Sequence, residues 1–241
     1  MILIKWDWTT GGPPPADDSR CRLGHGSGHV AKGAELVLMN RVETLILNSP
    51  PRAWLQRFYE VPLLERLGGR LDGARVLEIG CGRGVGTQLL IERLGAAHVT
   101  ALDLDPAMIA RARPRLARFG PRVDLRQGDA AALPLGDASV DAVVDFAIIH
   151  HIPAWRDAVA EAVRVLRPGG RFFFEEVTRH ALDRWSYRTF LDHPRTDRFT
   201  PRQFERELTG QGLDLRQPPV IRFFGDFVLG VAFKSSIAGD L

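Results

Sequence analysis

Cysteine and lysine are scarce in this chain of 241 residues, and each scarcity disfavours a class of protein. The two cysteines, Cys21 and Cys81, cannot form the disulfide framework of a small secreted domain, so we expect a reducing, cytoplasmic environment. Lysine is confined to positions 5, 32 and 234. The arginines are scattered, and the 32 basic residues are nearly balanced by 29 acidic ones. The net charge of +3 therefore does not favour a nucleic-acid partner.

Long apolar runs are also missing from the sequence. No segment approaches the roughly 18 uninterrupted apolar residues that a membrane-spanning helix needs, and residues 1–8 are too short an apolar stretch for a signal sequence. We therefore expect no membrane span. The hydrophobic fraction of 45% and the charged fraction of 25% are those of an ordinary globular protein, and the length suits one domain with one sizeable core.

The first 38 residues differ in composition from the rest. A proline run at 13–15 and a Gly/His stretch at 24–29 show no sustained period, which predicts a disordered tail over residues 1–38. Cys21, His25 and His29 recur at four-residue spacing and would align as metal ligands on a helix. The glycines disfavour that helix and a fourth ligand is missing, so no metal site is predicted. Residues 39–241 are expected to form a single domain, whose first helices lie within residues 39–70.

The segment that organises this domain is an apolar β-run over residues 75–79, followed by glycines at positions 80, 82, 84 and 86 and by a helical pattern to residue 94. Glycines permit positive φ or a close approach of the backbone to a ligand, and a helix beginning after such a loop directs free N–H groups into the gap. The dinucleotide fingerprint G-x-G-x-x-G does not fit, because Val85 or Thr87 occupies the third glycine place. The sequence therefore predicts a small polar ligand of another kind.

Acidic residues follow the next two predicted strands. The second strand, residues 98–105, ends in Asp103 and Asp105. An acid at the carboxyl end of the strand beside the glycine loop can accept hydrogen bonds from both hydroxyls of a ribose, and Asp103 is that acid. Asp105 precedes Pro106 at the N-cap position of the next helix, so we interpret it as structural. The third strand, residues 122–127, ends just before Asp129.

The remaining pattern completes an alternation of strands and helices. A fourth strand over residues 140–146, a helix over 154–166 and a fifth strand over 171–177 predict a parallel sheet built from right-handed crossovers. An insertion over residues 179–200, a helix over 201–208 and a final β-hairpin over 221–233 follow. Trp54, Phe58 and Tyr59, at helical spacing before the first strand, are interpreted as core rather than pocket wall.

Six motifs in residues 75–178 resemble, in order and spacing, those of the ubiquinone/menaquinone-biosynthesis-like (methyltransferase type 11) branch of the class I S-adenosylmethionine-dependent methyltransferases. They are Leu-Glu-Ile-Gly-Cys-Gly-x-Gly, Leu-Asp-Leu-Asp-Pro-x-Met, Gly-Asp-Ala, Leu-Pro-x-x-Asp-x-Ser-x-Asp-x-Val, His-His and Leu-Arg-Pro-Gly-Gly. The resemblance implies an α/β fold: a doubly wound, seven-stranded, mostly parallel, Rossmann-like sheet whose last strand is antiparallel, with helices on both faces. It implies S-adenosylmethionine as the cofactor, bound by residues 71–178, and an acceptor pocket covered by residues 179–200.

The resemblance also assigns roles to residues in or directly after the first four strands. Glu78 would organise the loop near the methionine amino group, and Leu104 would pack on the adenine. Asp129 and the Ala130 amide would read the adenine edge, with turn capping as the alternative for Asp129. The predicted cofactor-binding residues are Glu78, Gly80, Cys81, Gly82, Gly84, Asp103, Leu104, Asp129, Ala130 and Asp145.

His150 and His151 are the candidate catalytic residues. They follow the fourth strand at the carboxyl edge of the sheet, where one could remove a proton from an oxygen or carbon acceptor. The alternative is that the pair supports the loop and the cofactor. Glu175 and Glu176 point to opposite faces of the fifth strand, so only one of them can face the site as a base.

The activity implied by the resemblance is methyl transfer to a small-molecule acceptor. A nucleic-acid or protein methyltransferase and a cofactor-binding protein without turnover are the alternatives. The Asn/Asp-Pro-Pro-Tyr/Phe motif of amino-methylating nucleic-acid enzymes is absent from residues 145–148. The sequence identifies neither the acceptor nor the oligomeric state.

Overall fold

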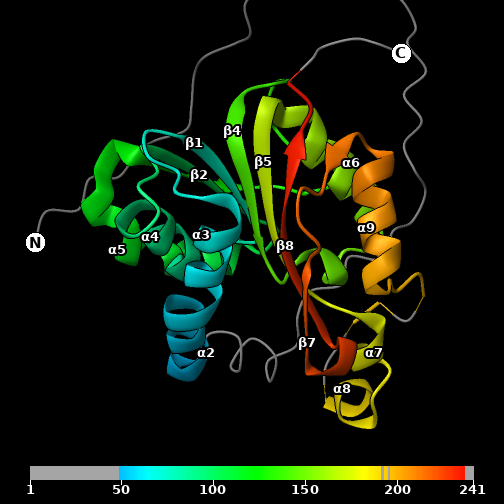
Figure 1. Cartoon of the computed structure of the whole chain (residues 1–241). Coiled ribbons are helices and arrows are strands. Elements are labelled where there is room, and N and C mark those ends of the chain that lie inside the picture. Colours follow the sequence, from blue (N-terminus) through cyan, green and yellow to red (C-terminus); the bar gives the residue numbers. More distant parts are fainter. Residues whose placement is uncertain (1–48, 191–192, 195, 237–241) are drawn as a thin grey trace, which may run out of the picture. The chain divides into compact units, whose positions relative to one another are not determined.

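The computed structural model describes residues 49–190, 193–194 and 196–236, drawn in colour in Figure 1. All of them belong to the compact unit Ala34–Leu241. The predicted tail over residues 1–38, with Cys21, His25 and His29, and the part of the first helical pattern before residue 49 lie outside the described residues.

An eight-stranded sheet forms the centre of the described unit (Figure 1). Five parallel strands run in the order β3-β2-β1-β4-β5, and β8 pairs with β5 in the antiparallel direction. Two short strands, β6 and β7, pair with β8 and are antiparallel to it. This confirms the predicted mostly parallel sheet with an antiparallel last strand; β7 and β8 form the predicted hairpin, and β6 adds one short strand. The bounds are β1 Arg75–Ile79, β2 His98–Asp103, β3 Val123–Gln127, β4 Val140–Phe146, β5 Leu166–Val177, β6 Leu213–Asp214, β7 Val220–Arg222 and β8 Phe227–Lys234.

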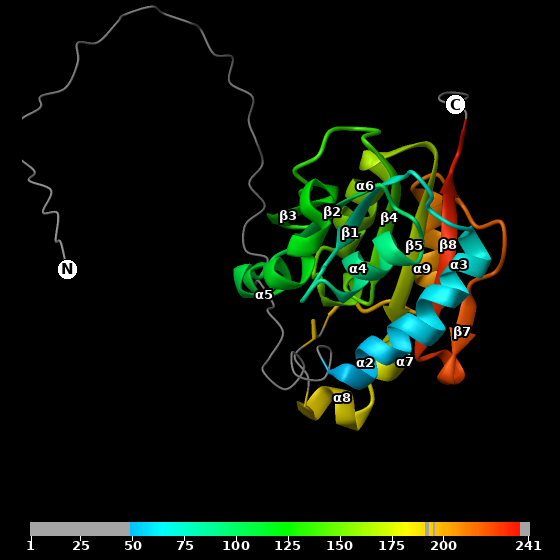
Figure 2. The ribbon, with the colours of Figure 1, turned by 90° about the vertical axis from the view of Figure 1, so that its left-hand side faces the viewer.

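Helices cover both faces of this sheet. The face shown toward the viewer in Figure 2 carries α3, α4 and α5, and the opposite face carries α6 and α9. A π-helical turn, Gln56–Glu60, joins α2 to α3, and two short helices, α7 and α8, lie in the connection between β5 and α9. The helices are α2 Pro50–Leu55, α3 Val61–Gly68, α4 Val85–Glu92, α5 Pro106–Leu116, α6 Trp155–Val165, α7 Arg179–Leu182, α8 Trp185–Phe190 and α9 Pro201–Gly210.

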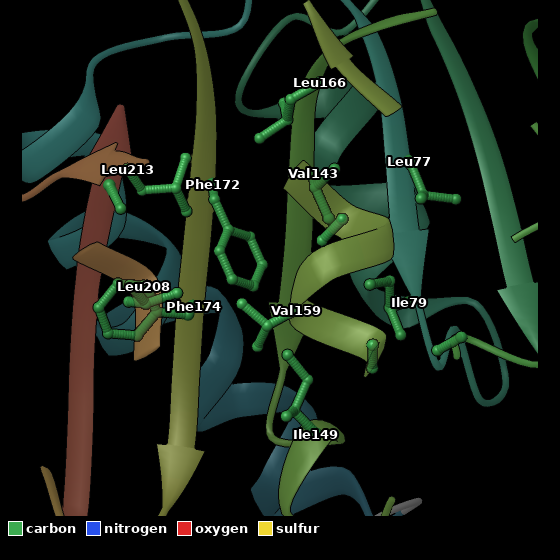
Figure 3. Packing of buried hydrophobic residues seen from close by; sticks show 14 of the residues in the cluster. Leu77, Ile79, Val143, Ile149, Val159, Leu166, Phe172, Phe174, Leu208 and Leu213 are labelled. Carbon is green, nitrogen blue, oxygen red and sulfur yellow. The ribbon is translucent and has the colours of Figure 1, made fainter. Parts of the chain in front are cut away.

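The core follows from strands that are buried on both faces. Phe172, Phe173 and Phe174 of β5 are all fully buried, and successive side chains alternate between the two helical layers. Phe172 and Phe174 pack toward Val159 of α6 and Leu208 of α9 (Figure 3). A continuous apolar run is therefore the sequence signature of this interior strand.

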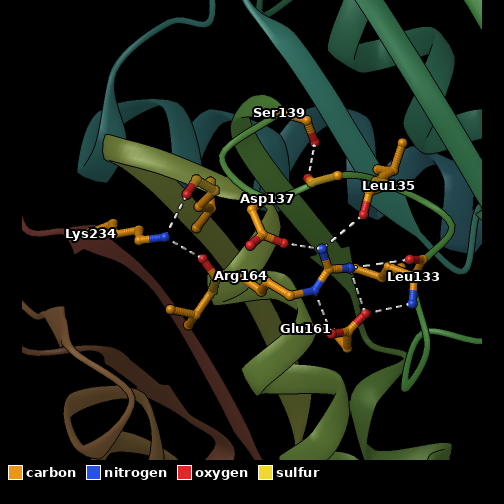
Figure 4. A network of polar contacts seen from close by, with 10 residues as sticks. Leu133, Leu135, Asp137, Ser139, Glu161, Arg164 and Lys234 are labelled. Atoms are coloured by element: carbon orange, nitrogen blue, oxygen red, sulfur yellow. Dashed lines mark hydrogen bonds and ion pairs between the residues drawn. The ribbon is translucent and has the colours of Figure 1, made fainter. Parts of the chain in front are cut away.

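One arginine fastens the long connection between β3 and β4 to the helix that follows it. The Arg164 guanidinium of α6 donates to the backbone oxygens of Leu133 and Leu135 and pairs with Asp137 and Glu161 (Figure 4). Glu161 in turn accepts the Leu133 N–H at 2.7 Å. The turn-rich sequence of this connection thus acquires a fixed position because its carbonyl groups bind a charged donor.

The structure corrects the interpretation of the aromatic residues before the first strand. Trp54 and Phe58 are 63% and 55% exposed, so they are not core residues. Tyr59 is half-buried, and its hydroxyl oxygen accepts a hydrogen bond from Arg222 at 2.6 Å. Trp54 and Phe58 share a face that is turned away from the core, whereas Tyr59 packs against the core and lines a pocket wall.

Several boundaries also differ from the prediction, and β2 ends at Asp103, two residues before the expected end. β5 begins at Leu166 instead of residue 171, because Leu166 pairs with Val140 before the register shifts to Arg171 opposite Ala142. The intervening segment forms an irregularity within the strand where a loop was expected. α9 continues to Gly210, two residues past the expected end. Within the described part of the chain, no helix is long and apolar enough to cross a membrane.

Candidate active site

The glycine loop connects β1 to α4 in a left-handed backbone conformation. Gly80, Gly82 and Gly84 have φ values of 69°, 51° and 79°, and α4 begins directly afterwards. A Cβ atom at Gly80 would lie 2.3 Å from the Ile148 side chain. The Cys81 N–H donates to the Leu102 carbonyl at 2.8 Å, which attaches the loop to β2. Side chains at these glycine positions would therefore be strained, as the sequence predicted.

Glu78 lies beneath this loop at the end of β1 and is 2% exposed. The Thr87 hydroxyl of α4 donates a hydrogen bond to its carboxylate. Burial raises the pKa of Glu78 to about 8, and the nearby Asp103 carboxylate acts in the same direction. The structure thus keeps a protonated acid under the loop at neutral pH, and a cationic ligand would favour its ionised form.

Asp103 lies beside the glycine loop at the carboxyl end of β2. One carboxylate oxygen accepts the Gly82 N–H at 2.8 Å, and the other accepts the Asp105 N–H at 2.9 Å. Each oxygen keeps a second acceptor position. Asp105 accepts the Ala107 N–H at 2.7 Å as the N-cap of α5, which confirms its predicted structural role.

The predicted adenine-reading residues follow β3. Asp129 is exposed, and its carboxylate accepts the Ala131 N–H at 2.9 Å, which is the turn-capping contact weighed as the alternative. Ala130 is buried, and the side chain of Leu104 is half-buried near the same edge of the sheet. The Gly128 N–H donates to the Asp103 carbonyl at 3.0 Å, so this turn and the ribose candidate are neighbours. The cofactor roles of these residues stay predictions.

Two buried carboxyl groups lie where β4 and β5 end. Asp145 accepts the Ile148 N–H at 3.0 Å through Oδ1, while its buried Oδ2 accepts no hydrogen bond from the described residues. Glu176 accepts the Ile149 N–H at 2.7 Å and the His150 N–H at 3.1 Å. Burial raises the pKa of Glu176 to about 7, and burial next to Glu176 raises the pKa of Asp145 well above its ordinary value.

His150 and His151 form a short 3-10 segment with Ile149 and are both buried. The Nδ1 atom of His150 lies 2.6 Å from a carboxylate oxygen of Glu176. Burial lowers the pKa of His150 to about 3, and burial together with two neighbouring imidazoles lowers the pKa of His151 far below its ordinary value. Neutral imidazoles therefore stand here, and Glu176 gives His150 a supporting contact. Their role as a base stays a prediction.

A cavity of about 490 Å³ opens beside these residues. Apolar side chains from α2, β5 and β8 form much of its wall. Charged groups line it where Arg52 pairs with Glu60 and lies 3.6 Å from Glu175. Burial, and next the charge of Glu60, raise the pKa of Glu175 well above its ordinary value. The lining residues are Arg52, Leu55, Tyr59, Glu60, Ala147, His150, His151, Glu175, Val177, Tyr187, His193, Arg222, Phe223, Phe227 and Leu229.

The sequence analysis missed the charged groups that the N-terminal helices contribute. Arg52 and Glu60 lie eight positions apart, a spacing that puts them on the same side of a helix after about two turns. Polar residues at such positions usually face solvent, so nothing in the pattern indicated burial. Of the two glutamates considered on β5, Glu175 reaches the cavity, whereas Glu176 contacts the 3-10 segment.

The architecture and this site define the α/β Rossmann-like fold of the class I methyltransferases. Residues 76–170 match the family model described as "Methyltransferase domain". The cofactor of the class is S-adenosylmethionine.

Known proteins agree with this assignment. The chain is 45% identical over 126 residues to a probable S-adenosylmethionine-dependent methyltransferase of Mycolicibacterium smegmatis, covering 52% of this chain and 46% of that protein. It is 36% identical over 148 residues to a probable phthiotriol/phenolphthiotriol dimycocerosates methyltransferase of Mycobacterium ulcerans, covering 61% of this chain and 56% of that protein. The chain thus spans about half the length of these curated relatives.

A solved S-adenosylmethionine-dependent methyltransferase from Aquifex aeolicus shares the fold. Its TM-score is 0.62 at 19% identity, and the match covers 80% of this chain and 96% of that one. At this identity the likeness concerns the fold alone.

Proposed function

We propose that the protein transfers the methyl group of S-adenosylmethionine to a hydroxyl group of a largely apolar small molecule held in the 490 Å³ cavity. The observation that carries the proposal is a shared segment at the end of β4. Asp145 is in register with Ile79, the residue before the glycine loop, and Ile148 packs against Gly80. Ala147, between them, lines the cavity. The loop and the cavity are therefore neighbours, as in-line transfer requires.

The residues around the loop fit the proposed cofactor. Three buried acids, Glu78, Asp103 and Asp145, offer carboxylate oxygens to the ammonium group and ribose hydroxyls of such a ligand. The buried Oδ2 of Asp145 accepts no hydrogen bond from the described residues, so it can receive a ligand N–H or O–H. When bound, S-adenosylmethionine supplies an electrophilic methyl carbon on a sulfonium that departs as a thioether.

The cavity favours an apolar acceptor with one polar reacting group. Leu55, Val177, Phe227 and Leu229 contribute apolar wall. The neighbouring Phe223 also lines the cavity and is largely exposed, so apolar surface continues to its rim. Two relatives are named as methyltransferases of phthiotriol and phenolphthiotriol dimycocerosates, names that denote hydroxyl-bearing acceptors. These names support a hydroxylated apolar acceptor for this chain as well.

Glu175 is the proposed proton acceptor for that hydroxyl. Its carboxyl group lines the cavity, and its Oε2 atom accepts no hydrogen bond from the described residues. Arg52 of α2, which pairs with Glu60 of the π-helical turn, lies 3.6 Å from this Oε2 atom. In the proposed step Glu175 would take the proton of the acceptor hydroxyl, and S-adenosylmethionine would supply the methyl group to the oxygen. The raised pKa of Glu175 makes its ionised form a stronger base than an exposed glutamate.

Binding and transfer are tested separately. S-adenosylmethionine and S-adenosylhomocysteine should raise the melting temperature of the full chain, and NAD should not. Asp103→Asn should weaken S-adenosylhomocysteine binding about tenfold or more, since it removes a charged acceptor. Asp72→Asn is the matched control, because Asp72 is exposed and precedes β1 at the opposite edge of the sheet.

Transfer is measured with methyl-labelled S-adenosylmethionine and a panel of long-chain alcohols, phenols and polar alcohols. We expect label in the apolar hydroxyl compounds. If neither S-adenosylmethionine nor S-adenosylhomocysteine raises the melting temperature at saturation, the proposal that the protein binds this cofactor is refuted. A clear shift without label in any acceptor would favour the alternative of a cofactor-binding protein without turnover.

A further inference from the structure

Three histidines converge at the wall of the cavity. His150 and His151 come from the 3-10 segment after β4, and His193 comes from the connection between α8 and α9. One ring nitrogen of each lies within 4.8 Å of the other two. Their ring centroids are 4.2, 4.5 and 5.4 Å apart, and all three residues line the cavity. The chain thus brings together imidazoles separated by more than 40 positions in the sequence.

Three imidazoles form a recurrent donor set for a divalent transition-metal ion. Zinc binds imidazole nitrogen at about 2.0–2.1 Å, so nitrogens in a tetrahedral site are about 3.3–3.4 Å apart. The three nitrogens here spread over up to 4.8 Å, and the His151 and His193 rings are stacked with 21° between their planes. Side-chain rotations that move the ring nitrogens by about an ångström would direct all three of them at one ion.

The contact between His150 and Glu176 resembles the outer shell of a metal site. Glu176 accepts two backbone N–H groups from Ile149 and His150, so its oxygens act as acceptors, and the His150 Nδ1 atom at 2.6 Å is the donor. This tautomer leaves the lone pair on Nε2. Metal-binding histidines usually make such a hydrogen bond to a carboxylate, which fixes the ring and raises its basicity as a ligand.

The charge around the cluster also suits a cation. Asp145, Glu175 and Glu176 are buried within the same end of the sheet, with Glu60 beside the cavity. Arg52 pairs with Glu60 and Glu175, whereas Asp145 and Glu176 form no ion pair with an arginine or lysine in the part of the chain that the structure describes. Buried carboxyl groups must be compensated by protons or by cations, and a divalent ion next to Glu176 would provide two charges.

We propose that His150, His151 and His193 bind one divalent transition-metal ion, Zn²⁺ or a similar borderline ion, with a fourth coordination position facing the cavity. The site is independent of the proposed function, but the role of the ion rests on it. In that role the ion would bind the acceptor hydroxyl, lower its pKa and ease transfer of its proton to Glu175. The sequence analysis did not connect His193 with the His-His pair, because His193 is remote from it along the chain.

The test uses the untagged full chain, stripped with a chelator and titrated with Zn²⁺ by calorimetry and with Co²⁺ by visible absorption. We expect one equivalent to bind, with ligand-field bands of a four- or five-coordinate cobalt ion. Glu176→Gln should weaken binding about 10- to 100-fold, because it removes the charge of the group that contacts His150, and His193→Ala should weaken it by more. His193→Cys restores a ligand, so it should recover binding and add a thiolate charge-transfer band, which a merely structural role of His193 would not produce.

Two controls separate this site from other histidines. His98→Ala removes an imidazole at the amino end of β2, at the opposite edge of the sheet, and should leave binding unchanged. His25→Ala with His29→Ala tests the N-terminal segment. Loss of the bound equivalent in that double variant, unchanged binding in a folded His193→Ala, or no binding to the wild type would overturn the proposal. Metal binding in a protein that transfers no methyl group would leave the site standing and refute only the function.

Discussion

Replacing Glu78 with glutamine isolates the electrostatic contribution of the acid beneath the glycine loop. The side chain is 2% exposed and accepts a hydrogen bond from the Thr87 hydroxyl, which a glutamine amide oxygen can accept equally well. Glutamine has nearly the same shape as glutamate but cannot ionise. The substitution therefore changes the titration of this position while leaving its packing almost intact.

The raised pKa of Glu78 determines whether its titration makes the fold more or less stable as pH rises. The Glu78 carboxyl group loses its proton near pH 4.5 in the unfolded chain and near pH 8 in the folded one. Between these values the folded state binds one more proton, so the free energy of unfolding falls as pH rises, by at most about 1.4 kcal/mol per pH unit. From about pH 5 to about pH 8 the loss reaches up to about 4 kcal/mol. Glutamine does not titrate, so Glu78→Gln removes this pH-dependent loss. The stability of the variant relative to the wild type should therefore increase from about pH 5 to about pH 8.

Urea unfolding followed by circular dichroism at several pH values measures the difference between the two proteins. Taking the difference cancels the other groups with shifted pKa values, such as Glu176 and His150. A difference that stays constant between pH 5 and pH 8, or that favours the wild type more at high pH, would refute the reasoning. The same variant should bind S-adenosylhomocysteine more weakly, since an amide cannot pair with its ammonium group. It should also lose the proton release that calorimetry in two buffers detects for the wild type.

Two further substitutions test the packing that positions the site. Gly86→Ala should destabilise the fold by about 1–3 kcal/mol and weaken cofactor binding, because the added Cβ would lie 2.0 Å from the Glu78 carboxylate and 2.8 Å from the Phe146 ring. Urea unfolding and binding calorimetry check both effects, and an unchanged Kd would contradict the second. Phe174→Ala should cost about 3–5 kcal/mol in the free energy of unfolding, since the ring is fully buried. Phe224→Ala is the matched control, because that ring is 98% exposed and its loss should cost little.

The parts of the fold that were predictable from the sequence depend on local chemistry. Glycines at alternate positions require positive φ, an acid before a proline caps a helix, and the continuous apolar run through Phe172–Phe174 fits a strand buried on both faces. Each signal lies within a few residues, so tertiary contacts did not need to be known.

The parts that escaped prediction depend on which way a face turns or on distant partners. Trp54 and Phe58 share a helical face, but only the tertiary structure shows that this face is exposed. The sequence around Asp129 fits both a cofactor contact and a turn cap, and the pattern alone does not distinguish these two roles. In the structure Asp129 accepts a hydrogen bond from the Ala131 N–H, which is the turn-capping contact. His193 joins the two histidines after β4 through the course of a connection that carries no periodic signal.

The segment from Asp145 to His150 links the proposed cofactor site to the cavity proposed for the acceptor. Asp145 is held in register with β1, Ile148 fills the space beside Gly80, and the next two backbone N–H groups are bound by Glu176 of β5. A shift of the glycine loop must therefore move the segment whose Ala147 lines the cavity. Other parts of the cavity wall come from α2, the β5–α9 connection and β8. Changes in those walls can alter the acceptor while the cofactor side keeps its geometry, so the dense sequence motifs end where the acceptor-facing segments begin.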